Sequence, residues 1–135
     1  MQINIQSNSN MDNLIINPST HTPRIHFDAS SGILEISGTS TPEDSFNFFQ
    51  PIMSWLELYK SQPAAKTTLI FKMEYFNTSS TAFILRIIKV VGQINEAEKN
   101  VSVQWHYQEE DEDLVEAGRD FGILAEIPIE LIQVP

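Results

Sequence analysis

The chain of 135 residues carries 18 acidic and 8 basic residues, which gives a formal net charge of −10, and it contains no cysteine. Its length fits one domain with a core of its own, and the lack of cysteine excludes a disulfide framework and a cysteine-based zinc site. Because the chain has no basic cluster, nucleic acid and anionic membrane surfaces are poor partners, whereas a protein partner fits. No stretch has the character of a membrane span or a signal peptide, so we expect a cytoplasmic protein.

The N-terminal part predicts an extension followed by paired strands. Residues 1–12 are polar and rich in asparagine and serine, which predicts a flexible extension before a single domain over residues 13–135. Leu14–Ile16 has the pattern of a short edge strand. Arg24–Asp28 and Ile33–Ser37 alternate between polar and apolar residues, and the loop between them contains a glycine, which predicts a β-hairpin.

A helix is expected directly after this hairpin. Thr41 is the expected N-cap, Pro42 takes the first helical position, and Glu43 and Asp44 lie in the first turn. Apolar residues then recur at helical spacing until Pro63 ends the element.

The junction between the next strand and the next helix is the most informative feature of the sequence. Thr68–Phe76 alternates like a strand, the polar run Asn-Thr-Ser-Ser interrupts it, and a helical apolar pattern follows from about Ser79 to Glu98. The first N–H groups of a helix and its positive dipole end favour an anion. The junction is therefore suited to carry a covalent phosphate on Thr78, Ser79 or Ser80. The alternative is that these hydroxyl groups only cap the helix.

The remaining elements are a strand, a helix and a short extended segment. Val101–Tyr107 alternates like a strand, and the acidic run Glu109–Asp113 leads into a last helix. The acids lack the glycine and the ligand spacing of a calcium loop, and the helix dipole suffices to explain them, so no metal is expected. Ile127–Val134 closes the chain as a short extended segment packed on the core.

The motifs of common enzyme classes are absent from the sequence. The five glycines form no phosphate-binding loop, and no nucleophile, base and oxyanion donor come together in a recognisable pattern. We therefore expect a protein that is not an enzyme and that needs no cofactor.

The order of the elements predicts the fold class. Strand–helix–strand units imply parallel pairing with right-handed crossovers. The strands nevertheless alternate, which places Lys72, Glu74, Gln104 and His106 on an open face. The prediction is an α/β fold, a two-layer sandwich of a mixed β-sheet with helices mainly on one face.

Several stretches together resemble one family, the SiaC-type regulatory phosphoproteins of bacteria. The resemblance runs from about Ile25 to Ile132, and the order of its motifs is specific. The stretches that carry it are Gly38–Ser45, Phe49–Trp55, Tyr75–Ser80, Trp105–Asp113 and Glu116–Phe121.

This resemblance implies a function as well as a fold. It implies a STAS-like domain, similar to anti-anti-sigma factors, that is phosphorylated on the threonine of Asn-Thr-Ser-Ser, here Thr78. It also implies a serine/threonine kinase with a histidine-kinase-like ATPase fold and a PP2C-type phosphatase. The unphosphorylated form would bind and activate a diguanylate cyclase, which links the switch to cyclic-di-GMP and biofilm regulation.

The partner surface expected from these considerations surrounds the phosphoacceptor. The helix face next to it would carry the contacts, and the alternative is a scaffold or adaptor domain whose hydroxyl groups only cap the helix. The expected partner-binding residues are Asn77, Thr78, Ser79, Ser80, Thr81 and Arg86.

Overall fold

The computed structural model describes residues 11–95 and 100–135, which form six strands and three helices. The strands are β1 (Leu14–Ile16), β2 (Arg24–Asp28), β3 (Ile33–Ser40), β4 (Lys66–Phe76), β5 (Asn100–Gln108) and β6 (Glu130–Val134). The helices are α2 (Ser45–Ser61), α3 (Thr78–Asn95) and α4 (Glu112–Ala125). Two expectations lie outside the described residues. One is the part of the N-terminal extension before residue 11, and the other is the end, at Glu98, of the helix expected after the strand Thr68–Phe76.

All six strands belong to one mixed sheet in the order β1-β2-β3-β4-β5-β6. The pairs β1–β2 and β2–β3 are antiparallel, whereas β3–β4, β4–β5 and β5–β6 are parallel. The three parallel pairs are joined by α2, α3 and α4 respectively, as strand–helix–strand units require. Both the hairpin and the parallel crossovers expected from the sequence are confirmed.

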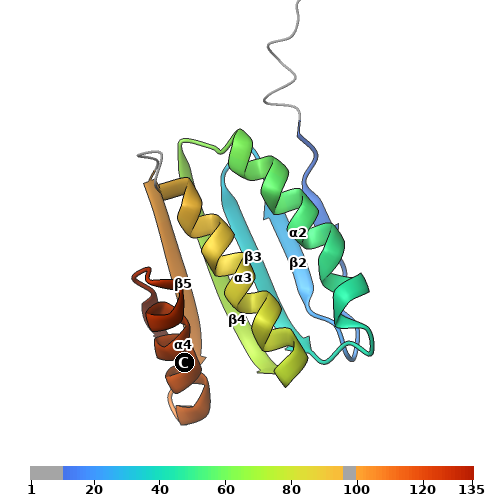
Figure 1. Cartoon of the computed structure of the whole chain (residues 1–135). Coiled ribbons are helices and arrows are strands. Elements are labelled where there is room, and N and C mark those ends of the chain that lie inside the picture. The colour runs from blue at the N-terminus through green and yellow to red at the C-terminus, as the bar shows by residue number, and fades with distance from the viewer. Residues whose placement is uncertain (1–10, 96–99) are drawn as a thin grey trace, which may run out of the picture.

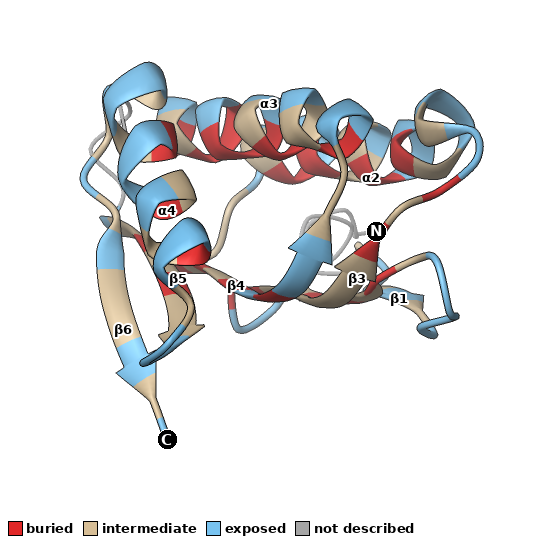
Figure 2. Cartoon of the chain, turned by 90° about the horizontal axis from the view of Figure 1, so that it is seen from below, coloured by how far each residue is buried: buried red, intermediate tan, exposed pale blue. Residues whose placement is uncertain are grey.

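The three helices lie on one face of the sheet, side by side in chain order (Figure 1). In the view turned by 90°, the helices and the sheet form two layers, and the buried residues lie between α2, α3 and the sheet (Figure 2). Along β4 the buried side chains of Leu69, Phe71 and Met73 alternate with the exposed Lys72 and Glu74. The two-layer α/β sandwich with an open polar face is confirmed.

Trp105 of β5 joins the last helix to the sheet. Its indole Nε1 donates to the carbonyl oxygen of Leu114 at 2.9 Å, and its ring packs against Phe121 of α4. A Cβ atom added to Gly118 would lie only 2.6 Å from the indole, so the missing side chain lets α4 approach the strand. The position of α4 therefore depends on one buried tryptophan.

The start of α2 differs from the expectation. The helix begins at Ser45, and Asp44 is its N-cap, because a carboxylate oxygen of Asp44 accepts from the backbone N–H of Asn47 at 3.1 Å. The predicted N-cap, Thr41, instead donates its backbone N–H to the carbonyl of His21 at 2.7 Å. This contact with a residue 20 positions away holds the segment before the helix. Capping preferences consider only residues close to the helix start, so they could not predict it.

Two residues that the sequence assigned to the extension contact the domain. Met11 packs against the core, and the carbonyl oxygen of Asp12 accepts from the indole Nε1 of Trp55 at 2.8 Å. Ile127–Val134 also pairs more fully than expected, because its second half is β6 and continues the parallel sheet beyond β5.

Candidate functional site

The candidate site lies where β4 ends and α3 begins. Asn77 separates the two elements, and it is the cap of the helix: its side-chain oxygen accepts from the backbone N–H of Ser80 at 3.0 Å. Its backbone carbonyl also accepts from the N–H of Thr81. The helix thus starts at Thr78, one residue before the expected start, because an amide side chain performs the capping.

The three hydroxyl residues of the first turn have different environments. Ser80 is completely buried, and its hydroxyl group donates to the carbonyl of Ser40 at 3.0 Å and lies 2.8 Å from the Ser40 hydroxyl. Ser79 is exposed, but its hydroxyl group bonds to Asn77 at 3.0 Å and to Ser45 at 2.6 Å. Thr78 is exposed, and among the described residues its side chain makes no hydrogen bond.

These environments separate the three candidates for a phosphate. A buried hydroxyl group cannot reach a kinase, so Ser80 is unsuited to modification. Its side chain holds the helix start against β3, although the sequence had placed it on the partner surface. Thr78 occupies the first helical position, where the backbone N–H groups are free of intrahelical partners and the dipole favours negative charge. The geometry favours Thr78.

Two further features of the site had no signal in the sequence. The bond between Ser45 and Ser79 joins the starts of α2 and α3, which are 34 residues apart in the chain. Two aromatic residues near these positions in the sequence, Phe46 of α2 and Tyr75 of β4, are each 60% exposed. Exposed aromatic residues are suited to protein contacts.

The remaining members of the expected partner surface lie on α3. Thr81 is half-buried, and its hydroxyl group donates to the carbonyl of Asn77 at 3.2 Å. Arg86 is exposed, and its guanidinium group lies 5.3 Å from the centre of the Phe83 ring. Arg86 lies eight positions after Thr78, which corresponds to about 12 Å along a helix axis. The structure therefore brings residues 77–81 together and places Arg86 two turns away.

The buried hydrogen bond between Ser40 and Ser80 gives a stability prediction. Ser80→Ala should lower the free energy of unfolding by about 1–3 kcal/mol, because it leaves the hydroxyl group of Ser40 buried without its partner. Chemical denaturation measures this loss. The matched control is Ser79→Ala, which removes an exposed hydroxyl group and should change the free energy by no more than about 0.5 kcal/mol. Equal losses for both variants would contradict the role given to Ser80.

The described part of the chain lacks the features of two other classes of site. Over residues 11–95 and 100–135, no three side chains of the metal-ligating types lie close enough together to share an ion. Within the same residues, none of the helices combines the length and the hydrophobicity that crossing a bilayer would need.

The fold and the site together define a two-layer α/β domain with an exposed hydroxyl group at the start of a helix. Over residues 16–134 the chain matches the model of the SiaC family of regulatory phosphoproteins, and the protein belongs to that family. It is 29% identical over 111 residues to an uncharacterised protein of Pseudomonas aeruginosa strain UCBPP-PA14, covering 82% of this chain and 88% of the relative.

Solved structures agree with this assignment. A chain in the crystal structure of the diguanylate cyclase SiaD in complex with its activator SiaC, from Pseudomonas aeruginosa, superimposes with a TM-score of 0.82 at 26% identity. The match covers 90% of this chain and 99% of that one. Apo-SiaC from the same organism gives a TM-score of 0.80 at 26% identity, with the same coverage. The SiaC-type resemblance recognised in the sequence is confirmed.

Proposed function

We propose that this protein is a binding switch that activates a diguanylate cyclase when it is unphosphorylated and is turned off by a phosphate on Thr78. Membership of a family of regulatory phosphoproteins supports the phosphate, and the similarity to a SiaC that activates the cyclase SiaD supports the target. The single observation that carries the choice of residue is the exposed side chain of Thr78 at the first position of α3, which makes no hydrogen bond with any residue that the structure describes.

The proposal includes two enzymes that set the state of the switch. A serine/threonine kinase with a histidine-kinase-like ATPase fold adds the phosphate to Thr78, and a PP2C-type phosphatase removes it. Asn77 caps the helix, and within residues 11–95 and 100–135 the hydroxyl group of Thr78 makes no hydrogen bond that a phosphate would break. This favours regulation over the alternative of a plain scaffold, in which the hydroxyl groups of this turn serve only as caps.

The proposed effect of the phosphate is local. It adds about −1.5 to −2 charges at pH 7, and at a helix N-terminus such a charge is stabilised by about 0.3–1 kcal/mol. The domain therefore stays folded, while the surface around Thr78 gains a bulky anion. A partner that docks on this surface is then excluded by shape and by charge.

The protein acts in this proposal by binding and does not turn over a substrate. A titration of the cyclase tests it: product formation should rise with the unphosphorylated protein and reach a plateau at a fixed molar ratio to the enzyme. The form phosphorylated on Thr78 should give little or no activation at the same ratio, because its docking surface is blocked.

The thermal melting of the two forms serves as the control. Similar melting temperatures are expected, since the phosphate occupies a favourable position. Equal activation by both forms would contradict the switch. A cyclase that is fully activated by trace, substoichiometric amounts would contradict action by binding. A large fall in melting temperature on phosphorylation would mean that the phosphate acts by unfolding the domain and not by blocking the docking surface.

A further inference from the structure

The two central parallel strands of the sheet separate at their carboxyl ends. The pairing of β4 with β5 runs from Lys66 and Asn100 to Phe71 and Trp105, and no pair joins the strands after that point. Both strands nevertheless continue, because β4 pairs with β3 as far as Phe76 and β5 pairs with β6 as far as Gln108. The sheet therefore contains a wedge between 72–76 and 106–108.

A β-bulge explains why β4 leaves its neighbour. On the β3 side, Gly38 pairs with Met73 and Thr39 pairs with Tyr75, so that Glu74 is an extra residue on β4. Such a bulge bends its strand and increases the local twist. Glu74, the extra residue, is among those that line the wedge.

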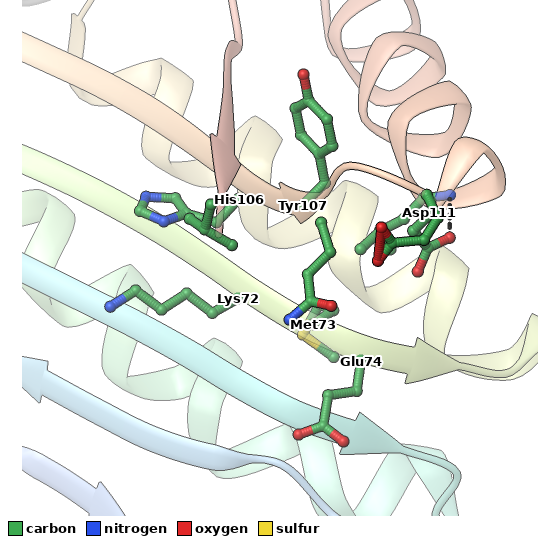
Figure 3. Close-up of a pocket in the computed structure, with 10 residues that line it drawn as sticks. Lys72, Met73, Glu74, His106, Tyr107 and Asp111 are labelled. Atoms are coloured by element: carbon green, nitrogen blue, oxygen red, sulfur yellow. Dashed lines mark hydrogen bonds between the residues drawn. The ribbon is translucent and has the colours of Figure 1, made fainter.

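The wedge is a cavity of about 920 Å³. Figure 3 shows its lining side chains, with Lys72, Met73 and Glu74 on β4, His106 and Tyr107 on β5, and Asp111 at the start of α4. The lining is completed by Gln108, Glu110, Leu114 and Val134. Crevices at the carboxyl ends of parallel strands are the usual place for ligands in open α/β sheets.

The charges of the cavity are mainly negative. Glu74, Glu110 and Asp111 supply three carboxylates; Asp111 is the N-cap of α4, and Glu74 and Glu110 form no ion pair with the residues that the structure describes. The one ammonium group of the lining, on Lys72, lies 3.5 Å from Oε1 of Glu35. Arg24 lies 3.3 Å from the other carboxylate oxygen of Glu35. The cavity therefore favours a cationic occupant.

The imidazole of His106 adds no compensating charge at neutral pH. Burial, assisted by the neighbouring Lys72, lowers the pKa of His106, so the ring is neutral at pH 7. Its Nε2 atom lies 3.0 Å from the side-chain oxygen of Gln104. A second copy of this chain is a poor occupant, because its own net charge is −10.

We propose that this wedge is a docking site for an extended, basic peptide segment of a partner protein. The separated edges of β4 and β5 offer backbone groups to an extended chain, in the manner of β-strand addition. Met73, Leu114 and Val134 provide apolar contacts for alternate side chains, and the carboxylates of Glu74 and Glu110 attract the basic ones. The site goes beyond the proposed switch at Thr78, since it needs neither the phosphate nor the cyclase.

The experiment is a titration of the full-length protein, followed by NMR of the backbone amides, with a short capped peptide in which lysine and valine alternate. Saturable shifts are expected at Met73, Glu74, His106 and Tyr107, and the peptide with glutamate in place of lysine should give none. Glu74→Lys should weaken the affinity for the lysine peptide by about tenfold or more, since it replaces an attraction with a repulsion inside a cleft.

The matched control is Glu116→Lys, which makes the same charge change on the exposed surface of α4 and outside the cavity. It should change the affinity by no more than about twofold, as expected for long-range screened charge. Equal weakening by both variants, or the absence of saturable shifts in the wedge, would overturn the proposal. If lysine amide alone gave the same shifts at the same concentration, the site would bind a small cation and the peptide assignment would be wrong.

The two proposals fail independently. Thr78→Ala should leave the affinity for the lysine peptide unchanged, because the residue does not line the cavity. Loss of phosphorylation control would therefore leave the wedge in place, and loss of peptide binding would leave the switch at Thr78 in place.

Discussion

Thr78→Ala should abolish the phosphorylation of this protein by its cognate kinase. Incubation of the wild type with the kinase and ATP should add one phosphoryl group per chain, which intact-mass spectrometry measures directly. The alanine variant should keep its unmodified mass, because the exposed hydroxyl group at the first helical position has been removed.

Two serine variants serve as controls for this result. Ser79→Ala should still accept one phosphate, since Ser79 is held by Ser45 and Asn77 and is not the proposed acceptor. Ser80→Ala should also accept one, because Ser80 is buried. A Thr78→Ala variant that is labelled as fully as the wild type would show that the acceptor lies elsewhere, and labelling lost only in Ser79→Ala would assign it to Ser79.

Local patterns in the sequence were sufficient to predict most of the fold. Alternation along β2, β3, β4 and β5 reflects a sheet with one buried and one exposed face, and this period is visible without any knowledge of the neighbours. The start of α2 was predicted wrongly because Thr41 is held by His21, a contact from a distant part of the chain. The full pairing of β6 was underestimated for the same reason.

The start of α3 was predicted to within one residue, but the roles of the residues at that start were not. The run Asn-Thr-Ser-Ser marked a helix start, but four polar residues with similar capping ability did not reveal that Asn77 is the cap. The burial of Ser80 depends on Ser40, and the bond of Ser79 depends on Ser45. Ser40 ends β3 and Ser45 begins α2, so capping patterns alone do not distinguish Thr78 from its neighbours, and its choice from the sequence rested on the family resemblance.

The wedge between β4 and β5 had an even weaker signal. The sequence placed Lys72, Glu74 and His106 on an open polar face, which is correct, but alternation cannot indicate where two strands stop pairing. The separation follows from the extra residue at Glu74, and a bulge of this kind is a property of the register with β3.

Trp105→Ala should have a large effect on stability, with a loss of about 3–5 kcal/mol in the free energy of unfolding. The indole is fully buried, and its ring centre lies 5.1 Å from that of Phe71 and 5.4 Å from that of Phe121. The variant would leave a cavity between β5 and α4 and would free the carbonyl oxygen of Leu114 from its hydrogen bond. Chemical denaturation monitored by far-UV circular dichroism measures the loss.

Trp55→Ala is the matched control, because Trp55, on α2, is only partly buried. It packs against Phe27 of β2 and Tyr59 of its own helix. It should cost clearly less than Trp105→Ala, since a partly solvated site leaves a smaller cavity. Trp105→Phe should recover most of the packing but not the bond to Leu114, and should therefore lie between the wild type and Trp105→Ala. If the two alanine variants lost equal stability, Trp105 would not be the residue that fixes α4 on the sheet. The expected order follows from the geometry of Gly118, whose missing side chain allows the helix to rest directly on the indole.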